Sequence, residues 1–311
     1  MTGFRLALLM VTAGLFLVAR EPRGLRVQRI ARFSRVVSDL DRAEAFYRDG
    51  LGFRTVMRGR SDPVTLAALG PGDAEAEEIV MRLGEETVVL VRFAQPGRPY
   101  PPDSRSDDLW FQHLAIVVSD MDAAYAHLLR QPGWQPISEG GPRLLPPSNG
   151  AVRAFKFRDP DGHPLELIWF PPGQGRAVWH AGVGGSLFLG VDHSALSVRS
   201  TSRSRAFYRR LGLRVSERSL NRGPAQAALD GLHGAIVRVT GLRPASSAGS
   251  GVELLGYQPP GRAAENECAH DVVTDWITMT VSPSSGALVR AMRDPDGHLL
   301  LLVDQSAGLP A

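Results

Sequence analysis

The sequence predicts an α+β fold made of four copies of a strand–helix–three-strand (βαβββ) module, with the fourth copy truncated. Three observations lead to this fold class. Apolar strand ends recur at nearly constant spacing, at Val37, Val118, Val198 and Val281. A helix motif containing Phe-Tyr occurs twice, and so does a turn motif Asp-Pro-Asp-Gly-His. A constant period of this kind is the signature of a repeated structural unit.

Each complete module begins with a strand and a helix. In residues 36–54, VVSDLDRAEAFYRDGLGFR, a Ser-Asp cap precedes a helix whose apolar residues share one face. The pattern returns at 198–214, VRSTSRSRAFYRRLGLR, and at 117–129, VVSDMDAAYAHLL, where Phe-Tyr is missing. A glycine after the helix can end it.

The modules end with hairpins. Residues 157–168, FRDPDGHPLELI, and 292–303, MRDPDGHLLLLV, place Asp-Pro-Asp-Gly between two apolar runs, which is a hairpin turn signal. The histidines of this turn, His163 and His298, recur in both copies. We interpret them as structural.

The repeats define four modules and their boundaries. Module 1 is residues 27–98, module 2 is 108–173, module 3 is 189–262, and module 4 is 271–305. The stretch between the first-strand and last-strand reference positions of module 4 is less than half as long as in any other module. Module 4 has therefore lost about one helix and one strand.

Two positions of the repeat hold histidine and glutamate in two of the four modules. Five residues before the reference valine, the first strands hold Arg32, His113, His193 and Trp276. The matching positions of the last strands hold Val89, Glu166, Glu253 and Leu301. Modules 2 and 3 thus each hold a histidine and a glutamate at these positions. A small residue follows each histidine by two positions, on the same strand face, and leaves room beside the imidazole.

The composition restricts the function classes. The 311 residues are enough for two ordinary domains, and 43% apolar with 22% charged residues is typical of a globular protein. Basic runs with interleaved aromatic residues are absent, so we expect no nucleic-acid partner. Lys156 is the only lysine. Cys268 is the only cysteine, which excludes an internal disulfide and a multi-cysteine metal site.

The N-terminal segment, residues 1–26, differs from the rest. Residues 6–19, LALLMVTAGLFLVA, form an apolar stretch that suits a signal peptide or anchor better than a full membrane span. Arginines follow the stretch and no clear cleavage site precedes them, so an N-terminal surface helix or an early start codon is the alternative. We expect a signal, an anchor or a helix over 1–26, with a potential membrane contact and an exported or membrane-anchored (periplasmic) location favoured over a cytoplasmic one.

The S-D-L-D…F-Y…L-G-F helix and the D-P-D-G-H-x-L-E-L hairpin make residues 27–305 resemble the vicinal oxygen chelate superfamily. That superfamily includes glyoxalase I, methylmalonyl-CoA epimerase, fosfomycin-resistance enzymes, extradiol dioxygenases and bleomycin-binding proteins. The resemblance implies curved mixed sheets formed by paired modules around a cavity that holds a divalent metal. Carried onto this sequence, it implies the metal ligands His113, Glu166, His193 and Glu253.

The number of ligands decides which modules pair. Pairing module 1 with 2 and 3 with 4 would leave one histidine and one glutamate in each cavity. Pairing 2 with 3 and 1 with 4 gathers all four ligands in one cavity and leaves the other with none, as in fused, domain-swapped glyoxalases. We expect the second arrangement, with one metal site. Because the four modules complete a site within one chain, a monomer suffices.

The resemblance also implies a function. We expect a glyoxalase-like enzyme of the lyase/isomerase type that acts on a small oxygenated molecule through a metal-stabilised enolate. Glu166 or Glu253 would be its base. The cofactor is one divalent ion, and the ligand set does not choose among Ni, Zn, Fe, Mn and Co. Asn149 and Arg153, near the cavity-facing hairpin of module 2, are candidate substrate contacts.

Two alternatives stay open at this point. An extradiol-type ring-cleaving dioxygenase uses two histidines and one carboxylate around Fe(II), and the second glutamate counts against it. A metal-free protein that sequesters a small molecule is the other alternative. The cavity between modules 1 and 4 would favour it, because Trp276, Val89 and Leu301 could stack a ligand there.

Overall fold

A computed structural model describes residues 25–304, apart from 71–73, 182–184, 246–248, 264–266 and 283–287. Most of the N-terminal stretch that we expect to be a signal, an anchor or a helix lies outside the described residues. Within the described ranges, no helix has the length and apolar character needed to cross a membrane.

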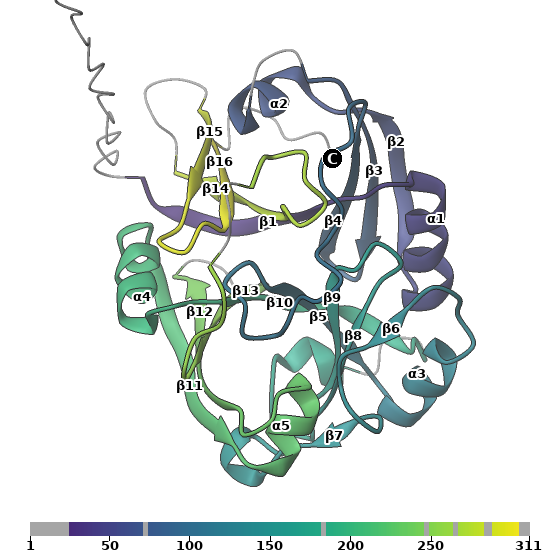
Figure 1. Ribbon diagram of the computed structural model, residues 1–311, viewed down its shortest axis with the longest axis vertical. Helices are drawn as coiled ribbons and strands as arrows, with labels where there is room; N and C mark the ends of the chain where they lie inside the picture. The colour runs from purple at the N-terminus through teal and green to yellow at the C-terminus, as the bar shows by residue number, and fades with distance from the viewer. Residues whose placement is uncertain are drawn as a thin grey trace, which may run out of the picture.

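The chain folds into two curved mixed sheets that lie one above the other in Figure 1. The first sheet has the strand order β15 (Val289–Arg293), β16 (Leu299–Asp304), β14 (Trp276–Val281), β1 (Val27–Val36), β4 (Glu86–Phe93), β3 (Ala76–Leu83), β2 (Arg54–Arg60). The second has the order β11 (Leu213–Arg222), β12 (Ile236–Pro244), β13 (Gly251–Tyr257), β10 (Phe188–Ser197), β5 (Gln112–Val118), β9 (Pro164–Trp169), β8 (Arg153–Arg158), β6 (Gln135–Pro136), with β7 (Arg143–Leu144) beside β8.

The strand order shows which modules pair. Antiparallel pairing of β1 with β14 joins modules 1 and 4, and antiparallel pairing of β5 with β10 joins modules 2 and 3. The pairing predicted from the ligand count is therefore confirmed. In its described part, module 4 contributes three strands and no helix to the first sheet, as its shortened sequence predicts.

Three helices of the repeat contribute their buried apolar residues to the core that the two sheets share. They are α1 (Leu40–Ala45), continued by a π-helix over Phe46–Gly50, α3 (Met121–Leu128) and α4 (Thr201–Arg210). Equivalent residues of the repeat cap the three helices: the side chains of Asp39, Asp120 and Ser200 each accept a backbone N–H from three residues further on.

Two further helices were not expected from the repeat. They are α2 (Pro63–Leu69) and α5 (Pro224–Asp230), and each follows the second strand of its module. Both have proline in the first turn, where its missing N–H costs nothing. Helix α5 packs against β7, β8 and β11, so module 3 reaches across to module 2.

The Asp-Pro-Asp-Gly-His turn of module 2 joins the two sheets. Its Asp159 accepts a hydrogen bond from the Tyr47 hydroxyl of module 1 at 3.1 Å. The Nε2 atom of His163 lies 2.8 Å from the backbone oxygen of Val36, at the end of β1. Both side chains of the hairpin are buried. The motif of module 2 thus docks on the strand and helix of module 1.

The same contacts recur between modules 4 and 3. Tyr208 donates to Asp294 at 3.2 Å, and His298 Nε2 lies 2.9 Å from the backbone oxygen of Ser197. The tyrosine of the Phe-Tyr helix motif and the histidine of the turn motif are therefore partners in one joint that occurs twice. This confirms the structural interpretation of both histidines.

A buried charge cluster strengthens the first joint. The Nδ1 atom of His163 lies 3.1 Å from Asp275, and the guanidinium of Arg35 lies between Asp275 and Asp159. Burial opposes protonation of His163, but the two nearby carboxylates outweigh it and raise its pKa above the ordinary value of 6.5. Protonated His163 therefore stabilises the folded state.

We expect His163→Gln to lower the free energy of unfolding by about 1–3 kcal/mol, since it leaves Asp275 with one charged partner fewer. The difference in stability between wild type and variant should have its full size below pH 6.5. It should become smaller as pH rises through the folded-state pKa of His163, because wild type then also loses the positive charge. Urea unfolding at several pH values measures this. Asp275→Asn should weaken the pH dependence, because it removes one of the two carboxylates that raise the pKa of His163, and a loss that grows with pH would contradict the account.

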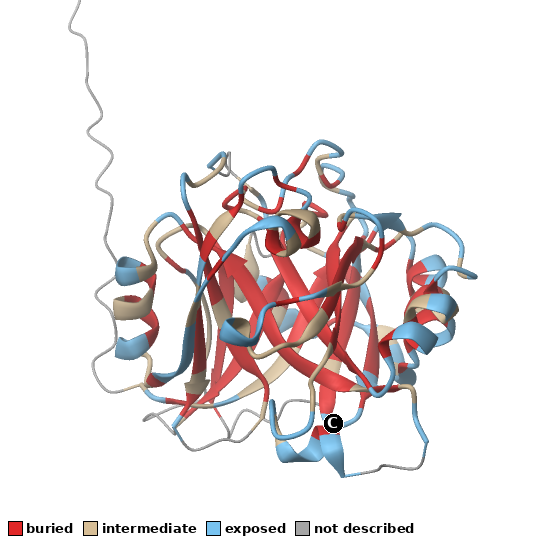
Figure 2. Ribbon diagram, turned by 90° about the horizontal axis from the view of Figure 1, so that it is seen from below, coloured by how far each residue is buried: buried red, intermediate tan, exposed pale blue. Residues whose placement is uncertain are grey.

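Three of the four positions of modules 1 and 4 that correspond to the predicted ligands lie in a packed apolar cluster; the fourth is Arg32. Trp276, Val89 and Leu301 belong to one set of buried side chains and are 2–3% exposed. Figure 2 shows the central strands of the sheets as buried along most of their length, including β14 and β16. The three residues pack against apolar neighbours, so they offer no stacking surface of the kind considered for a sequestering protein.

Candidate metal centre

The pairing of β5 with β10 brings the two histidines together. In this register His113 lies opposite Ala195, and His193 lies opposite Ala115. Ala115 lies two residues after His113, and Ala195 lies two residues after His193, so each alanine shares a strand face with its own histidine. Each imidazole therefore lies opposite a small side chain, and the two imidazoles share one face without crowding. Their ring centroids are 5.7 Å apart.

Parallel neighbours on either side place the two glutamates on the same face. Glu166 on β9 is registered with Ala115, and Glu253 on β13 is registered with Ala195. Modules 2 and 3 therefore contribute equivalent pairs, related by the antiparallel seam between β5 and β10. All four residues predicted as ligands come to one side of the second sheet.

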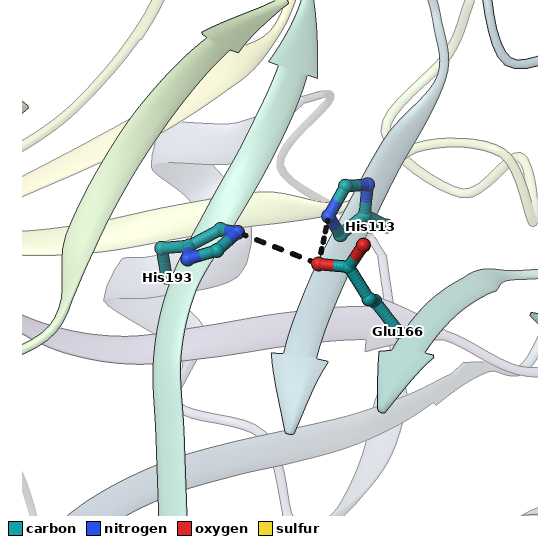
Figure 3. A group of neighbouring side chains, drawn as sticks. All are labelled: His113, Glu166 and His193. Carbon is teal, nitrogen blue, oxygen red and sulfur yellow. Dashed lines mark ion pairs between the residues drawn. The ribbon is translucent and has the colours of Figure 1, made fainter. Parts of the chain in front are cut away.

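Three of the four side chains form a tight group, and Figure 3 shows how they point toward one another. Glu166 Oε2 lies 3.4 Å from His113 Nε2 and 3.9 Å from His193 Nε2. One ligand atom from each of the three lies within 4.8 Å of the others. Glu253 is not in that group: its carboxylate lies 3.3 Å from His193 Nε2, and its side chain is more exposed than that of Glu166.

The donor atoms of this group fit a divalent cation. Both ring nitrogens of His113 and the Nε2 of His193 are buried and have no hydrogen-bond partner among the described residues. A buried nitrogen without a partner costs free energy that a metal bond would recover. Two imidazoles and a carboxylate are a ligand set used by several transition metals.

Burial and charge put two members of the tight group, His113 and Glu166, in the ionisation states that bind metals. Burial lowers the pKa of His113 to about 4, so its imidazole is neutral at pH 7. Burial opposes the charge on Glu166, but His113, Lys156 and His193 together lower its pKa to about 2. Metal ligands must be deprotonated, and these two are.

His193 and Glu253 form a pair of a different kind. Burial opposes the charged imidazole, but Glu253 and then Asp192 outweigh it and raise the pKa of His193 to about 9. Burial raises the pKa of Glu253 to about 7. Metal binding at His193 Nε2 would therefore release a proton.

A carboxylate that the sequence analysis missed orients His193. Asp192 accepts from His193 Nδ1 at 3.1 Å, and it also contacts Arg243 and Trp179. Neighbouring strand residues normally face opposite sides, but the β10 register shifts between Val191 and His193, and this irregularity lets the two side chains meet. The contact directs His193 Nε2 into the group.

A cavity of about 250 Å³ opens beside the four residues. Asn149, one of the two candidate substrate contacts, lines it and donates to Asn221 on β11. Arg153 does not line it. Its guanidinium binds Asp122 on α3 at 2.6 Å, because Ala154 is the β8 residue that faces the cavity and strand alternation turns Arg153 to the other side. The structure gives no support to a substrate contact by Arg153.

We expect Asp192→Ala to weaken divalent-metal binding about 10- to 100-fold, since a ligating imidazole loses its orienting partner. Competition with a chelator measures the affinity, and circular dichroism checks the fold. Asp122→Ala, which removes an exposed aspartate that pairs with Arg153, is the matched control and should bind metal like wild type. Equal affinities for both variants would contradict the role of Asp192.

Comparisons with known proteins agree with this architecture. The family model described as the Glyoxalase/Bleomycin resistance protein/Dioxygenase superfamily matches residues 29–167. A 2-epi-5-epi-valiolone epimerase from Actinomyces sp is 33% identical over 147 residues, which are 44% of this chain and 76% of that protein. Among solved structures, glyoxalase I from Zea mays aligns with a TM-score of 0.57 at 16% identity, over 91% of this chain and 93% of that one.

A putative dioxygenase from Bacillus subtilis subsp. subtilis str. 168 aligns with a TM-score of 0.55 at 14% identity, over 91% of this chain and 87% of that one. At such identities the two solved structures establish the fold alone. The family match and the epimerase relative rest on sequence, and they establish the superfamily as well as the fold. The chain belongs to the Glyoxalase/Bleomycin resistance protein/Dioxygenase superfamily.

Proposed function

We propose that this protein is a divalent-metal-dependent isomerase that moves a proton at a carbon next to a carbonyl group of a small oxygenated substrate. The observation that carries the proposal is the division of the four residues. His113, Glu166 and His193 form a compact ligand group, whereas Glu253 stands beside it, facing the cavity. A divalent ion held by that group would supply Lewis acidity toward a substrate carbonyl oxygen.

Glu253 suits the role of base better than Glu166. Glu166 contacts both histidines and is the less exposed of the two. Glu253 contacts only His193 of the group and lies at the cavity wall, where its carboxylate can reach a substrate carbon. A general base with a pKa near the working pH is the most effective, and burial brings Glu253 toward that range.

The name of the curated relative supports a proton-transfer reaction. The Actinomyces protein is named as an epimerase, and it shares 33% identity with this chain over 147 residues. Inverting a carbon next to a carbonyl requires removal of its proton and return of a proton to the opposite face. Glu253 can take the proton in the first step, and the proton that returns to the opposite face then comes from solvent. The compound in that relative's name, 2-epi-5-epi-valiolone, is therefore the first substrate to test.

Proton exchange in D₂O is the direct test. Wild-type protein loaded with Zn²⁺, Ni²⁺ or Mn²⁺ should catalyse incorporation of deuterium next to the carbonyl of 2-epi-5-epi-valiolone or of a simple hydroxyketone, followed by NMR. Glu253→Gln should slow the exchange by about 10²- to 10⁴-fold, the usual contribution of a positioned base. It should still bind one metal ion, because the three-residue group is intact.

The controls separate the base from the metal. His113→Ala and His193→Ala should each lose both the metal and the exchange. Exchange that continues unchanged in Glu253→Gln would contradict the assigned base. Ligand binding without any exchange in metal-loaded wild type would favour a sequestering protein.

A ring-cleaving dioxygenase is the second candidate, and one observation favours it. The compact group consists of two histidines and one carboxylate, which is the Fe(II) set of such enzymes. Fe²⁺-loaded protein supplied with catechol and dioxygen would then form a ring-opened product. Glu253→Ala should increase that activity if Glu253 merely crowds the iron, and absence of product in both proteins would exclude this candidate.

A further inference from the structure

The only lysine of the chain lies in the wall of the candidate site. Lys156 is on β8, directly opposite Glu166 on β9, and it lines the same cavity. Its strand neighbours, Phe155 and Phe157, point to the other face and pack in the apolar core. A charged residue between two core phenylalanines faces the cavity because strand side chains alternate.

The ammonium group of Lys156 is buried and only partly satisfied. Its side chain is 4% exposed, and Nζ donates to Asp230 Oδ1 at 2.7 Å. An ammonium has three protons to donate. Among the described residues, no second acceptor takes a hydrogen bond from it. Two donors therefore remain for a group in the cavity.

A buried acceptor without a partner lies beside it. Gln226 Nε2 donates to the other carboxylate oxygen of Asp230 at 2.7 Å, which fixes the orientation of the amide because a carboxylate only accepts. Gln226 Oε1 is buried, lines the cavity and has no donor among the described residues. One carboxylate thus holds a cationic donor and an amide acceptor at the same wall.

We propose that Lys156, Gln226 and Asp230 form a hydroxyl-binding subsite of the cavity. A hydroxyl group can accept from the lysine ammonium and donate to the amide oxygen at once. Asp230 already balances the charge of Lys156, and Glu166 lies opposite, so the subsite suits a neutral hydroxyl rather than a carboxylate.

The inference rests on the proposed function and narrows its substrate class. The substrate is a polyhydroxylated carbonyl compound, with a carbonyl oxygen at the histidine end and a further hydroxyl at Lys156. The two ends of the subsite come from different modules: Lys156 from module 2, and Gln226 and Asp230 from α5 of module 3. Specificity, like the ligand group, then depends on the pairing of these modules.

The test compares ligands that differ by one hydroxyl. Hydroxyacetone, dihydroxyacetone and erythrulose are titrated calorimetrically into Zn²⁺-loaded wild type, Lys156→Met and Gln226→Leu. In wild type, one added hydroxyl should strengthen binding about 10-fold or more, as expected for a charge-assisted hydrogen bond. Both variants should lose that increment, which is measured in each protein relative to its own affinity for hydroxyacetone.

Arg158→Met is the matched control. It removes a cation of the same strand that, within the described part of the chain, donates to the backbone oxygens of Gly162 and Ser104 and lies over the Tyr100 ring. This variant should keep the increment. A second measurement needs no variant. Because the chain has one lysine, ¹⁵N-lysine labelling gives a single side-chain ammonium resonance, which erythrulose should shift and hydroxyacetone should leave in place.

An increment that persists in Lys156→Met, or an ammonium resonance that no hydroxyketone moves, would overturn the subsite. Neither result depends on turnover. Deuterium exchange that proceeds normally alongside such a result would leave the proposed isomerase standing without this subsite. If deuterium exchange is absent but the hydroxyl increment is intact, the subsite stands and the proposed isomerase does not.

Discussion

The antiparallel pairing of β5 with β10 is the constraint on which the candidate site depends. It places each histidine opposite the alanine of the other module, so two side chains from different modules, far apart in sequence, share one face. A slip of this register by one residue would turn one histidine to the opposite side of the sheet. The parallel partners β9 and β13 then add the glutamates from the flanks.

The two sheets use the same topology for different purposes. At the first seam, between β1 and β14, three of the four equivalent positions are occupied by apolar side chains that pack around Trp276, and the fourth is Arg32. At the second seam the polar groups remain, and the structure must satisfy them with each other, with Asp192, or with a bound ion and substrate. A seam with no ligands to position tolerates a shortened module, which accounts for the form of module 4.

The two hairpin joints explain why the halves stay together. Module 2 docks its turn on module 1, and module 4 docks on module 3, so each sheet reaches across to the other through a tyrosine–aspartate contact. Chain order and sheet order therefore differ: neighbours in sequence contact through joints, whereas modules 2 and 3 share the site.

The repeat made the module pairing and the convergence of the four residues predictable, because equivalent positions in a repeat have equivalent environments. Features that depend on local departures were not predictable. Strand alternation places Asp192 away from His193, and only the irregularity in β10 reverses this. Strand alternation in β8 turns Arg153 away from the cavity and Lys156 toward it. The sequence alone does not show which of the two strand faces is the cavity side. Helix α5, which supplies Asp230, has no counterpart in the helix motif.

The central claim is that one divalent ion is bound at the β5–β10 seam. Anomalous diffraction from crystals grown with Zn²⁺, recorded on both sides of the zinc absorption edge, tests it most directly. The account predicts one strong peak per chain in contact with His113, Glu166 and His193, and none near Arg32 or Trp276. A zinc peak confined to other parts of the surface, with the two imidazoles hydrogen-bonded to water, would contradict it.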